Sequence, residues 1–100
     1  MYRCRVEKRI YSAPAAFTRL CYELDLAQAP ELGRELSDGR WFSGPLIFVV
    51  WNVDEACFNC RVQDESPVSD VVYDYSHDWL VQNYLHEGWR QCPELGDDVP

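Results

Sequence analysis

The stretch Leu46-Ile-Phe-Val-Val-Trp-Asn-Val53 decides the fold class that this chain suggests. Nearly every residue in it is β-branched or aromatic and none is charged, which is typical of a strand in the middle of a sheet. The polar pair Asp54-Glu55 follows, and the segment 57–63 then returns with alternating polarity. This pattern predicts an antiparallel hairpin whose first arm is the middle strand of the sheet.

Alternating polarity also marks the N-terminal segment 2–11 as a strand with one buried side. Its apolar positions point one way, and a mostly basic set points the other way. These are Tyr2, Cys4, Val6 and Ile10 on the apolar side against Arg3, Arg5, Glu7 and Arg9 on the polar side. The sequence therefore predicts a first strand with a basic outer face.

Two longer helices are expected, one before and one after the hairpin. Ser12 can cap a helix over about 13–26. Apolar residues recur through that segment at helical spacing, namely Ala13, Ala16, Phe17, Leu20 and Leu24. Ser76 and Gly88 can begin and end the second helix.

Three shorter segments complete the expected order of elements. Residues 31–36 predict a short helical piece that the following Asp38-Gly39 would stop. Residues 67–76 fit either a helix or a strand, and the spacing of their valines favours the helix. Residues 89–92 suit a short edge strand.

The resulting order is β-α-β-β-α with a further short strand, which predicts an α+β fold of the ferredoxin-like type. In that fold an antiparallel sheet of three to four strands carries two main helices on one face. We expect one domain over residues 1–92 and a frayed acidic tail over residues 93–100. Trp51, Phe48 and Phe17 are expected in its core.

The charge of the chain is unevenly distributed. The 100 residues carry a net charge of −8, with seven bases and six acids in residues 1–53 but eleven acids and two bases in residues 54–100. Such a field repels phosphate backbones and anionic membranes, so we expect neither direct nucleic-acid binding nor membrane binding. It favours a basic partner surface, while a merely solubilising role for the acids remains the alternative.

Five cysteines, an odd number, together with the lack of a signal peptide or a membrane-length apolar run, predict reduced thiols and a cytoplasmic location. Cys57 and Cys60 form a C-x-x-C pair that could serve a metal or a redox reaction. Strand alternation sends the two side chains to opposite faces, so we expect no metal or cofactor there and two packing residues instead.

The sequence contains no recognisable catalytic motif, and the expectation is a non-enzymatic protein. His77 and Asp78 are neighbours on a predicted helix, and their directions differ by about 100°, so their adjacency predicts no catalytic pair. A small enzyme stays open as an alternative.

Aromatic and acidic residues are interleaved from residue 70 to residue 84. Tyrosine and tryptophan often anchor interfaces, and carboxylates around them would pair with partner arginines or lysines. The predicted partner-binding residues are Asp70, Tyr73, Asp74, Tyr75, Asp78, Trp79 and Tyr84. The alternative is that several of them belong to the core.

These features favour an acidic protein-binding module. By functional analogy, small acidic inhibitors, immunity proteins and DNA mimics mask the basic surface of a nuclease or another nucleic-acid-binding protein. The alternative is a metal- or thiol-dependent module built on Cys57 and Cys60, or a small enzyme. In addition, both faces of the strand 46–53 are apolar, so we expect that one face is covered by the loop at Trp41 and Phe42, by a partner, or by a second copy in a homodimer.

Overall fold

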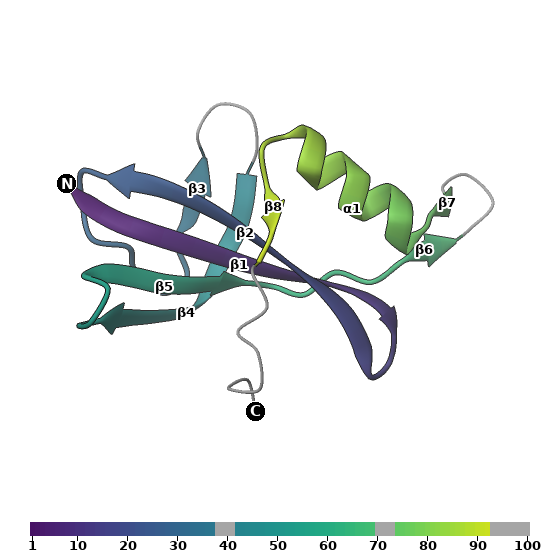
Figure 1. Ribbon diagram of the computed structural model, residues 1–100, viewed down its shortest axis with the longest axis horizontal. Coiled ribbons are helices and arrows are strands. Elements are labelled where there is room, and N and C mark those ends of the chain that lie inside the picture. The colour runs from purple at the N-terminus through teal and green to yellow at the C-terminus, as the bar shows by residue number, and fades with distance from the viewer. Residues whose placement is uncertain (38–41, 70–73, 93–100) are drawn as a thin grey trace.

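Strands dominate the computed structural model, which describes residues 1–37, 42–69 and 74–92 (Figure 1). Six strands form one mixed sheet in the order β3-β4-β5-β1-β2-β8. They are β1 (Tyr2–Ala13), β2 (Ala16–Leu26), β3 (Glu35–Ser37), β4 (Phe42–Asn52), β5 (Cys57–Val62) and β8 (Arg90–Gln91). A separate pair joins β6 (Val68–Ser69) to β7 (Asp74–Tyr75), and the described chain has one helix, α1 (His77–His86).

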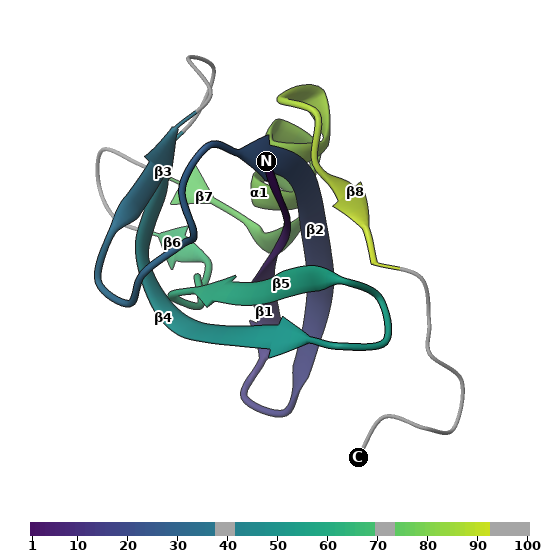
Figure 2. The ribbon, with the colours of Figure 1, turned by 90° about the vertical axis from the view of Figure 1, so that its left-hand side faces the viewer.

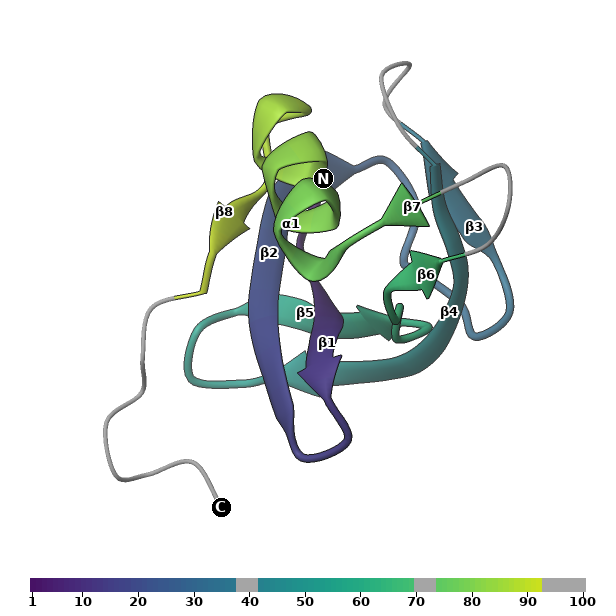
Figure 3. The same cartoon turned by 90° about the vertical axis from the view of Figure 1, so that its right-hand side faces the viewer.

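The ferredoxin-like α+β prediction is wrong. The described chain forms a curled six-stranded sheet with one short helix, and β1 and β5 run parallel within it. Figure 2 shows the curl, and Figure 3 shows α1 lying beside β2 on one side of the sheet. The predicted middle strand 46–53 is also misplaced, because β5 and β1 occupy the centre of the strand order.

The first predicted helix, 13–26, is the strand β2. It pairs antiparallel with β1 along nearly its whole length, from Tyr2 opposite Leu26 to Ala13 opposite Ala16. The apolar residues of this segment also repeat with period two, at Leu20, Tyr22, Leu24 and Leu26. Helical spacing and strand alternation were both present in the sequence, and pairing with β1 decided between them.

The helix predicted for 31–36 is wrong, and the helix favoured over a strand for 67–76 is not found in the described residues of that segment. The segment 31–36 contains a turn at Gly33, whose φ of +83° suits glycine, and then enters β3. Within 67–76 the described residues form the short strands β6 and β7, with Val68 opposite Tyr75.

Several local predictions are confirmed. The structure shows the β4–β5 hairpin, the edge strand β8, and a helix that begins after Ser76. The Ser76 hydroxyl accepts a hydrogen bond from the Trp79 N–H at 3.2 Å, as an N-cap should. Gly88, at φ +105°, follows the helix end.

The core lies on the face of the sheet that α1 covers. The apolar side of β1, with Cys4, Val6 and Ile10 fully buried, meets residues from β2, β4, β5 and the helix. The other members of the buried cluster are Leu20, Leu46, Cys60, Val62, Leu80, Val81 and Trp89. The expected core positions Trp51, Phe48 and Phe17 are instead 46%, 52% and 39% exposed, so that prediction is wrong.

Candidate functional site

The face of the sheet opposite α1 is polar and rich in arginine. On β1, Arg3, Arg5, Glu7 and Arg9 point to this side, as the alternation predicts. The register with β2 places Glu23 opposite Arg5, Cys21 opposite Glu7 and Arg19 opposite Arg9. On the other flank of β1, Asn59 lies opposite Arg5 and Arg61 lies opposite Glu7, and Arg90 of β8 lies opposite Cys21.

These side chains surround a cleft of about 570 Å³, a volume in the range of small-molecule sites. Residues from β1, β2, β4, β5 and β8 line it, so distant segments of the chain build it together. They are Arg5, Glu7, Arg9, Arg19, Cys21, Phe48, Asn52, Glu55, Asn59, Cys60, Arg61, Arg90 and Cys92.

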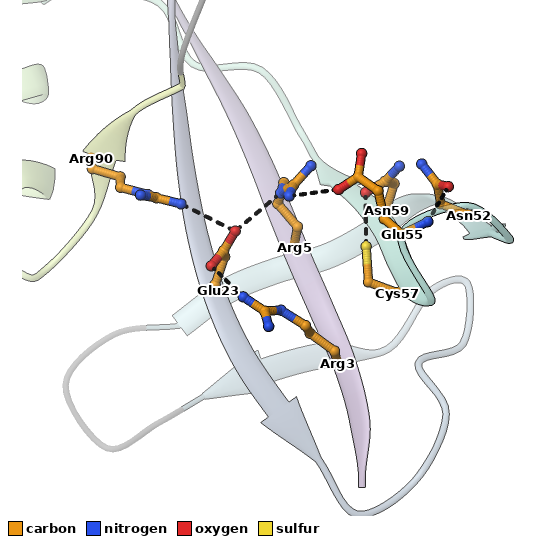
Figure 4. A network of polar contacts seen from close by, with 8 residues as sticks. All are labelled: Arg3, Arg5, Glu23, Asn52, Glu55, Cys57, Asn59 and Arg90. Atoms are coloured by element: carbon orange, nitrogen blue, oxygen red, sulfur yellow. Dashed lines mark hydrogen bonds and ion pairs between the residues drawn. The ribbon is translucent and has the colours of Figure 1, made fainter.

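Two carboxylates beside the cleft, Glu23 and Glu7, are each shared among several guanidinium groups. Glu23 receives hydrogen bonds or ion pairs from three arginines, Arg3 at 3.2 Å, Arg5 at 3.3 Å and Arg90 at 3.1 Å (Figure 4). Arg5 also reaches Glu55 at 2.9 Å. One carboxylate cannot occupy all the donors of three guanidinium groups, which carry five N–H donors each.

The same sharing recurs around Glu7. It pairs with Arg9 at 3.3 Å and with Arg19. Arg61 donates through one terminal nitrogen to both oxygens of Asp64, at 2.7 and 3.0 Å. Glu7 is therefore shared by two arginines, whereas Asp64 pairs with Arg61 alone.

The cleft is positive although the chain is acidic. Five arginines and two glutamates line it, a formal charge of +3. With Arg3, Glu23 and Asp64, which bond to lining residues, the count is six arginines against four carboxylates, or +2. A low-dielectric wall of sheet focuses such a charge toward the opening.

The carboxylate of Glu23 stays ionised in this setting. Burial alone would raise its pKa, but hydrogen bonds from Arg3 and Arg5, with the charge of Arg90 nearby, outweigh burial and lower the pKa of Glu23 below its usual value. The ion pairs around it therefore persist at neutral pH.

Three cysteines are among the residues that line the cleft, Cys21, Cys60 and Cys92. Burial, and then a hydrogen bond to Cys21, raise the pKa of Cys92 to about 12. Cys92 is therefore a neutral thiol at physiological pH. Because the thiolate is the reactive form, this thiol is poorly suited to act as a nucleophile.

The two cysteines of the C-x-x-C pair, Cys57 and Cys60, do not point toward a common site. Cys60 shares the core face with Cys4, and their sulfur atoms lie 3.5 Å apart, whereas Cys57 sits on the other face against Asn59 at 3.7 Å. The hydrogen bond to Cys4, with burial, raises the pKa of Cys60. Within residues 1–37, 42–69 and 74–92, no group of three or more histidine, cysteine, aspartate or glutamate side chains could hold a metal ion.

His77 and Asp78 are in contact, contrary to expectation. His77 Nδ1 lies 3.1 Å from an Asp78 oxygen, and His77 Nε2 lies 2.9 Å from the Thr18 hydroxyl. This chain of contacts is outside the arginine cleft, on the side of the sheet that α1 covers. The side chain of Asp78 is 95% exposed, so water screens it, and we assign these residues no catalytic role.

Of the seven predicted partner-binding residues, the structure describes the side chains of three, Asp78, Trp79 and Tyr84. Asp70 and Tyr73 lie outside the described residues, and Asp74 and Tyr75 form β7. Asp78 is exposed and Trp79 is 47% exposed, both in the first turn of α1.

Tyr84 faces inward instead. Its hydroxyl donates to Glu65 at 2.6 Å, and its ring packs on Trp89 with centroids 5.7 Å apart. The Lys8 ammonium lies 5.1 Å from the centre of the same ring. Tyr84 is half-buried and packs against the core cluster.

Sequence reasoning missed the cleft, although one signal for it was visible. The basic outer face of β1 was predicted, but Arg19 and Glu23 were assigned to a helix, and Arg90 and Arg61 lie far along the chain. The alternation of Arg19, Cys21 and Glu23 with apolar residues would have placed them on the same face of a strand.

Comparison of the chain with known protein families, with curated proteins and with solved structures found no match. In the part of the chain that the structure describes, no helix has the length and apolar character needed to cross a membrane.

Proposed function

We propose that the protein is a non-enzymatic binding module whose arginine-lined cleft takes an anionic group, a carboxylate or a phosphate. The observation that carries this proposal is the excess of guanidinium groups over carboxylates in a cleft of ligand size. Arginine binds both kinds of anion through paired N–H donors. The cytoplasmic location suggested by the five cysteines remains part of the proposal.

The other lining groups support a small organic anion over a bare ion. Phe48, 52% exposed, offers an aromatic wall at one side of the cleft, and Asn52 and Asn59 supply amide groups beside it. Ligand sites commonly combine an apolar wall with a few polar groups that fix orientation. We therefore expect a ligand with one anionic end and one apolar or planar part.

Substitution at Arg5 tests the proposal. Calorimetric titration of the protein with citrate and with inorganic pyrophosphate at low ionic strength should detect binding of at least one of them. Arg5→Gln should weaken that binding at least about tenfold, because a hydrogen bond to a charged group contributes about 1.5–3 kcal/mol. Glu23→Gln should strengthen it, since it releases three guanidinium groups from a shared carboxylate.

Arg34→Gln is the matched control. Arg34 is an exposed arginine that pairs with Glu31 and does not line the cleft, so its loss should leave the affinity unchanged. Equal weakening by Arg5→Gln and Arg34→Gln, or no binding of either anion, would contradict the proposal. Circular dichroism of each variant checks that the fold is kept.

A second candidate function is the docking of a basic protein partner, which the exposed first turn of α1 favours. Asp78 and Trp79 offer a carboxylate and an aromatic surface there, on the other side of the sheet from the cleft. In this case polylysine, used as a basic probe, should bind more weakly to Asp78→Lys than to the unmodified protein, with Arg5→Gln having little effect. Equal binding to the unmodified protein and Asp78→Lys would exclude this candidate.

A further inference from the structure

We propose that the free edge of β4 pairs with the same edge of a second copy of this chain, so that two curled sheets join into one. This inference goes beyond the cleft and does not depend on its ligand. It rests on three observations: an unpaired stretch of backbone, the apolar and uncharged side chains on that stretch, and the charges at its two ends.

The unpaired stretch is residues 47–53. The ladder between β3 and β4 ends at Leu46, which accepts from the Gly33 N–H at 2.8 Å and donates to the Arg34 carbonyl at 2.9 Å. In the described chain, no strand other than β5 pairs with β4 beyond that point. Figure 2 shows β3 beside the first part of β4 only, with the rest of β4 running along β5.

The outward-facing backbone groups can be placed from the ladder. Leu46 turns its N–H and C=O toward β3, and the bulge between Leu46 and Phe48 shifts the alternation by one residue. Val49 and Trp51 therefore carry the next N–H and C=O groups that face away from β5. A second strand can bond to these groups.

Five of the seven side chains of this stretch are apolar and exposed. Ile47, Phe48, Val50, Trp51 and Val53 are 51%, 52%, 44%, 46% and 77% exposed. Residues 47–53 contain no charge and no proline, two of the devices that protect a sheet edge from pairing. Beyond the bulge between Leu46 and Phe48, the register from Phe48 to Asn52 is regular, so this part of the edge is open to pairing.

The geometry of the edge fits an identical strand. A two-fold axis through Val50, perpendicular to the sheet, pairs the backbone N–H and C=O of Val49 with those of Trp51 in the second copy. The same face of each sheet then lies on the same side of the dimer. Val50 is the central residue of the free stretch 47–53, so the whole stretch lies opposite its copy. A two-fold axis would place a charged residue at its centre opposite the same charge in the second copy. This stretch contains no charged residue, so no such repulsion arises.

Charged residues stand at both ends of the free stretch. The same axis brings Asp54 of the second copy to the end of β3, where the exposed Arg34 pairs with Glu31 through one nitrogen and has further N–H donors for a second carboxylate. Because the pairing is symmetric, this contact occurs twice. An antiparallel pair with its axis perpendicular to the sheet also places the two arginine clefts on the same side of the joined sheet.

Charged substitutions at Val50 test the proposal. The unmodified protein should sediment with twice the 11.7 kDa mass of the chain at concentrations well above the dissociation constant. Val50→Lys and Val50→Asp should each weaken dimerisation at least about a hundredfold, because the axis opposes each new charge to its own copy. The matched controls Phe17→Lys and Phe17→Asp alter a residue of similar exposure on β2 and should leave the dimer intact.

A second measurement works without substitutions. Hydrogen exchange of the Val49 and Trp51 amides should slow as the protein concentration rises, because only the dimer protects them. A single mass of 11.7 kDa up to about 1 mM would overturn the proposal. A dimer that survives both Val50 variants, or one in which these amides exchange at a rate independent of concentration, would overturn it equally.

Discussion

Replacing Trp89 with alanine is expected to lower the free energy of unfolding by about 3–5 kcal/mol, the usual cost of truncating a buried aromatic residue. Trp89 is 3% exposed and packs between Tyr22, with ring centroids 5.6 Å apart, and Tyr84, at 5.7 Å. Its loss leaves a cavity where α1 turns into β8. Urea unfolding followed by circular dichroism measures the change.

Trp79→Ala is the control for this prediction. Trp79 is 47% exposed in the first turn of α1, so its truncation should cost much less than that of Trp89. Equal costs for the two tryptophans would show that the helix does not dock as described. Because β8 follows Trp89 directly, Trp89→Ala should also weaken anion binding through displacement of Arg90.

The second large effect is expected at Ile10, a fully buried residue of β1. Ile10→Ala removes three carbons from the core cluster and should cost about 2–5 kcal/mol. The midpoint of urea unfolding should fall while the slope of the transition stays the same, since the surface exposed on unfolding barely changes.

Ile47→Ala supplies the same chemical change at a site that is 51% exposed. At dilute protein concentration it should cost less than about 1 kcal/mol, because little contact is lost. A comparable loss at Ile47 and Ile10 would place the core on the wrong face of the sheet.

The candidate site could be predicted only in part. The polar side of β1 was readable because alternation is a local property, and it placed Arg5 and Glu7 on a common face before any partner strand was known. The contributions of Arg19, Arg61 and Arg90 depend on which strands lie beside β1. That is a property of the whole sheet, which spacing within one segment does not encode.

Tyr84 shows what the spacing of residues along a helix leaves open. Tyr84 and Trp79 are five positions apart on one helix, and sequence spacing did not reveal that Tyr84 turns inward toward Lys8, Glu65 and Trp89. Burial of a tyrosine is decided by what packs against it, so composition alone does not determine how much of its ring stays exposed.

By itself, the sequence determined the elements whose signals are local: the alternating strand β1, the β4–β5 hairpin and the helix capped by Ser76. Tertiary structure decided the rest. Segment 16–26 carries both helical and strand periodicity, and it became β2 because β1 offers a complete ladder and a shared apolar face. The parallel pairing of β1 with β5, which brings the arginines together, joins residues more than fifty positions apart. Such contacts form because they bury apolar side chains from several strands at once, and no single stretch of the chain specifies them.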